Sequence, residues 1–146
     1  MIELQAKLAR VRRLCEVDRS QLTAYVIELA KSEASLQQAQ QQVTKTKDEL
    51  HRASTEDLPA SITARHQSAL FANHLVQQLG NLQSTLVEVR ELRDARMQSV
   101  IQQQTRIKGW ESLIDKLNHE LSLEQQKQDS LIADDRYLSN LAGRNS

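Results

Sequence analysis

The stretch "STEDLPASIT", residues 54–63, holds the only proline of the chain and interrupts a sequence that otherwise favours helix. Taken alone it has three interpretations: a linker between domains, a kink in one long helix, or the turn of a hairpin. Pro59 clashes with the preceding helical turn and disfavours helical geometry at Leu58. The side-chain oxygens that can cap a new helix are those of Ser54, Thr55, Asp57 and Ser61.

The composition predicts a few long helices rather than a compact globule. The 146 residues include only three Gly and one Pro, and aromatic residues make up 3% of the chain. Turn-forming residues and bulky core residues are therefore both scarce. The abundant Leu, Gln, Ala and Glu lose little side-chain freedom on a helix.

Charge and hydropathy argue against several classes of function. Lys plus Arg and Asp plus Glu number 19 each, so no net charge attracts the chain to nucleic acid. No stretch reaches the roughly 20 apolar residues of a membrane-spanning helix, and the N-terminus lacks the apolar segment of a signal peptide. We therefore expect a cytoplasmic protein that neither binds nucleic acid nor inserts into a membrane.

The residues needed for catalysis or for a metal site are not arranged in any recognisable motif. Phosphate-binding loops, dinucleotide-binding fingerprints and paired metal-binding histidines are missing. Cys15 is the single cysteine, which suits a small buried apolar residue better than a redox or metal site. His51 and His66 come near each other only if the chain folds back at the proline. We expect no enzymatic activity, no cofactor and no metal.

The first half of the chain carries a heptad pattern with one apolar edge and one mixed edge. Such a narrow seam is typical of a helix that packs against one or two others. The apolar edge consists of Leu8, Cys15, Leu22, Leu29, Leu36, Val43 and Leu50. The mixed edge consists of Leu4, Val11, Asp18, Tyr25, Ser32, Ala39 and Thr46.

The pattern returns after Pro59, displaced by one residue when both halves are counted in sevens. One edge comprises Leu79, Leu86, Arg93, Val100, Ile107, Ile114 and Leu121, and the other comprises Leu75, Leu82, Val89, Arg96, Gln103, Trp110 and Leu117. A slip of one residue rotates the seam by roughly 100°, so a continuous coiled coil would lose it here. We therefore predict an all-α fold, an antiparallel two-helix coiled-coil hairpin, while a kinked rod that dimerises remains the alternative.

The hairpin has predictable boundaries and register. We expect one domain over residues 1–146, with helices at 2–53 and 62–141, a tip at 54–61 and a frayed tail at 142–146. A tip centred near Asp57 places Asp18 opposite Arg96, where the two form a register-fixing pair or both reach solvent at the rim of the seam. It also leaves the second helix overhanging from about Leu113 by roughly 45 Å, with no partner in the chain.

Two parts of the sequence resemble the FliJ family of flagellar export proteins. One is the tip "EDLPASIT" (residues 56–63) followed by "ARHQSALFANHLVQQL" (64–79); the other is "TRIKGWESLIDKLNHELSLEQQKQDSLIADD" (105–135). The resemblance implies a non-enzymatic stalk, similar to the gamma subunit of rotary ATPases, that enters the export ATPase hexamer and promotes its assembly. It also implies contacts with the membrane-embedded export gate and with export chaperones.

The resemblance and the expected exposure of side chains suggest where partners bind. The end that enters the ring pore would carry Arg10, Arg12, Arg13, Trp110, Leu117 and Leu121. The end facing the gate would carry Leu70, Phe71 and Leu75. The equivalent stalk of a virulence-type secretion system, or an unrelated scaffold or adaptor that homodimerises, remain the alternatives.

Overall fold

The computed structural model describes residues 1–57 and 59–144, and all regular structure in that part of the chain is helical. Helix α1 spans Ile2–Thr55 and helix α2 spans Ile62–Arg144, with lengths of 54 and 83 residues. The two helices pack against each other as an all-α helical hairpin whose second helix is the longer. The predicted fold class is therefore confirmed.

The helix ends differ slightly from the expected ones. Ser54 and Thr55 remain in α1, because their hydroxyl groups donate to the carbonyl oxygen of His51 at 2.8 and 3.0 Å. At the start of α2, the Ser61 hydroxyl accepts a hydrogen bond from the main-chain N–H of Ala64 at 3.3 Å and so caps the helix.

The C-terminal end of α2 also differs from the expectation. The helix continues through residues 142–144, which we expected to fray. The rest of that expected tail, Asn145 and Ser146, lies outside the described residues, as does Leu58.

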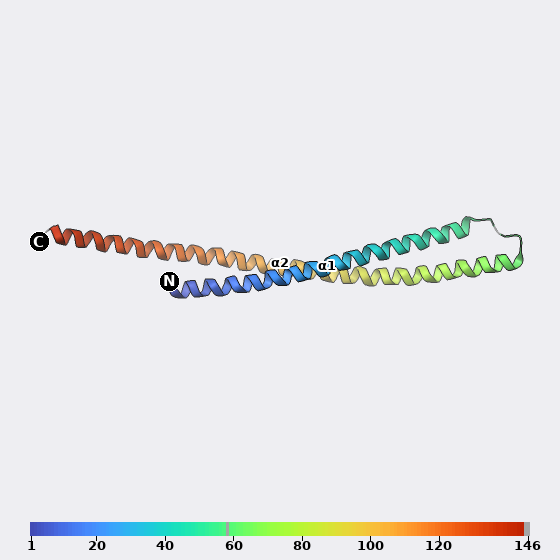
Figure 1. Ribbon diagram of the computed structural model, residues 1–146, viewed down its shortest axis with the longest axis horizontal. Helices are drawn as coiled ribbons and strands as arrows, with labels where there is room; N and C mark the ends of the chain where they lie inside the picture. Colours follow the sequence, from blue (N-terminus) through green and yellow to red (C-terminus); the bar gives the residue numbers. More distant parts are fainter. Residues whose placement is uncertain (58, 145–146) are drawn as a thin grey trace. The chain divides into compact units, whose positions relative to one another are not determined.

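Two compact units divide the helices between them. Unit 1 contains Met1–Thr23 and Gln102–Ser146, and unit 2 contains Ala24–Ile101. In unit 1 the start of α1 (blue in Figure 1) runs beside the orange part of α2, and the red end of α2 continues beyond the N-terminus. In unit 2 the connection around Pro59 joins the end of α1 to the start of α2.

The heptad positions identified in the sequence form the contact between the helices. Every predicted seam position in either helix is buried or half-buried. In unit 1 the core is formed by Leu8, Val11 and Leu117, against which Leu4, Trp110, Leu113, Ile114 and Leu121 pack. In unit 2 the most deeply buried seam residue is Leu75, at 2% exposure.

The register differs from the expected one by about ten residues. Asp18 lies against Arg106, with 3.5 Å between its Oδ2 and the arginine Nε, and not against Arg96. Near the tip, Ala53 and Phe71 line the same shallow hollow, so the first turns of α2, residues 62–68, extend past the end of α1 (Figure 1). The tip is therefore not a tight turn centred on Asp57.

Candidate partner-binding surfaces

In unit 1 a buried group of polar contacts around Asp18, here called the Asp18 node, joins the two helices. Asp18 is 5% exposed, and its Oδ2 accepts a hydrogen bond from Trp110 Nε1 at 2.6 Å. Gln103 Nε2 donates to the main-chain oxygen of Asp18 at 2.9 Å. Since Arg106 also approaches the carboxylate, this buried charge is both paired and hydrogen-bonded, as a charge at a seam position must be.

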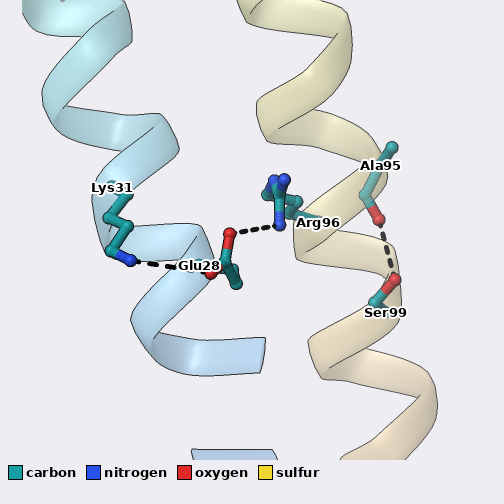
Figure 2. A network of polar contacts seen from close by, with 5 residues as sticks. All are labelled: Glu28, Lys31, Ala95, Arg96 and Ser99. Carbon is teal, nitrogen blue, oxygen red and sulfur yellow. Dashed lines mark hydrogen bonds and ion pairs between the residues drawn. The ribbon is translucent and has the colours of Figure 1, made fainter. Parts of the chain in front are cut away.

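The expected register pair between Asp18 and Arg96 does not form. Arg96 instead pairs with Glu28 in unit 2, with 2.8 Å between Nη1 and Oε2 (Figure 2). The other carboxylate oxygen of Glu28 lies 3.7 Å from Lys31 Nζ, so one glutamate holds two cations. The sequence placed these two charged residues on the seam but did not identify their partners, because the register differs from the expected one.

The three arginines expected to contact a partner are all exposed in unit 1. Arg12 donates to Asn118 Oδ1 at 3.4 Å, which ties it to α2, whereas Arg10 and Arg13 point away from the seam by their helical phase. Arg19 was not among the predicted residues. It donates to Glu111 at 3.2 Å, and this hydrogen bond raises the pKa of Arg19.

In the observed register, three other predicted contact residues lie in or against the core between the two helices. Leu117 is 3% exposed and belongs to the core of unit 1, while Trp110 and Leu121 pack against that core. We had placed Leu117 and Leu121 on the overhang. Because α1 reaches about ten residues further along α2 than expected, it covers them, and they are not available to a partner in this conformation.

The exposed end of α2 is shorter than the expected overhang. From residue 125 to residue 144 every position is exposed. At 1.5 Å per residue these 20 residues, here called the tail, extend for roughly 30 Å. The large apolar side chains of the tail that are at least half exposed are Leu131, Ile132, Tyr137 and Leu138, at 50–65% exposure.

At the tip end, two of the three predicted residues are exposed. Leu70 and Phe71 are 55% and 54% exposed, whereas Leu75 is buried in the seam of unit 2. Phe71 borders a shallow hollow, which is also lined by Glu49, Arg52, Ala53, Glu56 and Ser68. This end therefore offers an aromatic side chain beside charged groups of α1.

Neither a metal centre nor a membrane span was found in the part of the chain that the structure describes. Residues 1–57 and 59–144 contain no group of three or more His, Cys, Asp or Glu side chains placed to hold a metal ion. Over the same residues, neither helix combines the length and the apolar character that crossing a membrane would require.

Comparison with known proteins does not identify a family. No protein-family model, no curated protein and no solved structure matches the chain. Function must therefore be argued from the surfaces described above.

Proposed function

We propose that this chain is a non-enzymatic stalk protein of the flagellar protein export apparatus. The stalk inserts its tail into the ring of the export ATPase, promotes assembly of the hexamer, and couples it to the export gate and export chaperones. It works in the cytoplasm, peripheral to the membrane-embedded part of the apparatus. The equivalent role in a virulence-type secretion system requires the same surfaces.

One observation carries this proposal: the tail is helical, exposed at every position and apolar on part of its surface. An isolated helix of about 20 residues is marginally stable in water, and four large apolar side chains exposed on it favour burial by another protein. A single helix roughly 30 Å long beyond a two-helix section is a shape that a ring pore can accept. The resemblance of residues 105–135 to the FliJ family supports the same partner.

Unit 2 supplies the second contact that coupling requires. Leu70 and Phe71 are exposed in unit 2, and aromatic side chains are enriched at the energetic centres of interfaces. We assign the gate contact to this pair. Leu75, buried in the seam, stabilises the helix that presents them.

The test is ATP hydrolysis by the export ATPase with and without this protein. We expect the full chain to stimulate hydrolysis and to co-sediment with the hexamer, while the chain alone hydrolyses no ATP. The double variant Leu131→Glu/Leu138→Glu removes two apolar contacts and should weaken binding at least about tenfold.

The control is Ile27→Glu, which replaces an apolar side chain by one glutamate at a site of 51% exposure in unit 2. It should stimulate hydrolysis as the unmodified chain does. If the unmodified chain neither stimulates nor co-sediments, the stalk proposal fails and the scaffold alternative is favoured. If both charged variants bind normally, the tail is not the contact.

A further inference from the structure

Helix α2 carries a second heptad pattern on the face beside its seam, rotated by one residue or roughly 100° about the helix axis. Its positions are 62, 66, 69, 73, 76, 80, 83 and 87, with the alternating spacing of four and three that defines a coiled-coil seam. Within unit 2 these positions are all exposed, whereas the seam residues Leu75, Leu79 and Leu82 between them are buried or half-buried. We call this set of positions the outer stripe.

The outer stripe carries no Asp, Glu, Lys or Arg, and its residues are Ile62, His66, Ala69, Asn73, Val76, Gly80, Gln83 and Val87. Ile62, Val76 and Val87 on it are 85%, 54% and 52% exposed. Between Ile62 and Val87 the only charged residue is Arg65, although 26% of the whole chain is charged. Solvent-facing sides of helices are normally charged, and interface cores are depleted of charge.

The outer stripe is bounded by charged residues at one end and by the start of α2 at the other. The next two positions in the same spacing, 90 and 94, are Arg90 and Asp94. At the other end the stripe begins with Ile62, the first residue of α2. The uncharged surface is therefore a bounded patch of 26 residues, about 39 Å long.

We propose that the outer stripe binds the same stripe of a second copy of this chain in an antiparallel, two-fold symmetric dimer. In one register, Ile62 faces Val87 of the second copy, Ala69 faces Gly80, and Asn73 faces Val76. Two-fold symmetry repeats each of these pairs. Large residues thus meet at both ends of the patch, and small residues meet between the ends and the centre.

A second copy fits this patch better than a charged partner does. Two uncharged stripes meet without burying an unpaired charge, which would be costly. Gly80 lies in the middle of a helix, where glycine is unfavourable, and within the described part of the chain nothing lies within 4 Å of where its Cβ would be. A close approach by Ala69 of the second copy gives this glycine a function. Parallel pairing would instead place Gly80 on Gly80 and Asn73 on Asn73.

Cysteine cross-linking tests the pairing and its direction. Positions 69 and 80 are 11 residues, or roughly 16 Å, apart on one helix, too far for a disulfide within the chain. The double variant Ala69→Cys/Gly80→Cys should form a disulfide-linked dimer under mild oxidation, because each new cysteine meets the other kind across the interface. Either single variant should not, because identical positions are also about 16 Å apart in this register.

The unmodified chain is the control for cross-linking, because its Cys15 is buried. Cross-linking by either single variant alone would indicate parallel pairing and overturn the proposed dimer. Absence of a cross-link in the double variant would do the same.

Sedimentation equilibrium tests the association without added cysteines. Because a single narrow helical seam makes a small interface, we expect a weak dimer, with the mass rising from 16.6 kDa towards twice that value as concentration increases. Val76→Glu places two like charges close to the two-fold axis and should raise the dissociation constant at least about tenfold. Ile27→Glu, of similar exposure, should not change it.

A chain that stays monomeric at millimolar concentration overturns the proposal and leaves the stripe to a different protein. Equal weakening by Val76→Glu and Ile27→Glu would also overturn it. This inference concerns a surface other than the tail, so it stands or fails independently of the proposed contact between the tail and the ATPase.

Discussion

At the scale of single residues, the charged side chains of Asp18 and Arg96 on the seam each have an ion-pair partner on the other helix. Asp18 and Arg96 occupy seam positions in a mainly apolar pattern, so a polar partner is expected for each. The structure gives Asp18 the Trp110 indole and gives Arg96 the Glu28 carboxylate. Glu28 lies outside the two seam positions of the heptad, so the apolar pattern did not indicate it as a partner.

The Asp18 node should be the most sensitive polar site of unit 1. Asp18→Ala leaves the Trp110 N–H without its acceptor and should lower the free energy of unfolding by about 1–3 kcal/mol. Asp18→Asn keeps an acceptor oxygen and should lose less. Urea denaturation followed by Trp110 fluorescence measures both, because Trp110 is the only tryptophan.

Asp94→Ala is the control for this prediction. Asp94 is 62% exposed in its side chain, and among the described residues its ion pair is with the neighbouring Arg93, so its loss should change stability by less than about 0.5 kcal/mol. If Asp18→Ala is as mild as Asp94→Ala, the node does not stabilise the hairpin.

At the scale of the helices, the heptad periodicity was sufficient to predict the fold but not to predict the register of one helix against the other. The two heptad patterns and their one-residue slip at Pro59 predicted which faces meet, and those faces are buried. Register depends on how the chain crosses between helices. We assumed a tight turn at Asp57, whereas the first turns of α2 extend past the end of α1. No periodic signal reports the path of a six-residue connection.

The shift in register also decided which of the predicted contact residues are exposed. In the observed register α1 packs over Leu117 and Leu121, and the exposed end of α2 comprises residues 125–144. Leu70 and Phe71 stay exposed because they lie off the seam, whatever its register. Exposure that was predicted from helical phase therefore agrees with the structure, whereas exposure that was predicted from the assumed turn does not.

Double-mutant cycles test the register directly. Glu28→Ala combined with Arg96→Ala should show a coupling energy of roughly 0.3–1 kcal/mol, modest because both side chains are partly exposed. The same cycle on Asp18 and Arg96 should show none beyond error. Coupling between Asp18 and Arg96, with none between Glu28 and Arg96, would restore the register expected from a tight turn.

At the scale of the whole molecule, the chain presents three surfaces that its own hairpin leaves exposed. The tail is assigned to the export ATPase, Leu70 and Phe71 to the gate, and the outer stripe to a second copy. The tail and the outer stripe lie in different units, so each can be altered without touching the other. The tail carries the proposed function.

Amide hydrogen exchange over the tail, measured with and without the export ATPase, tests this central claim most directly. Amides of residues 125–144 should exchange fast in the free protein, because no packing holds this helix, and become protected when the ATPase is added. Seam amides such as those of Leu8 and Leu117 should be protected in both states. A tail already protected in the free protein, or one that stays unprotected with the ATPase present, would contradict the account.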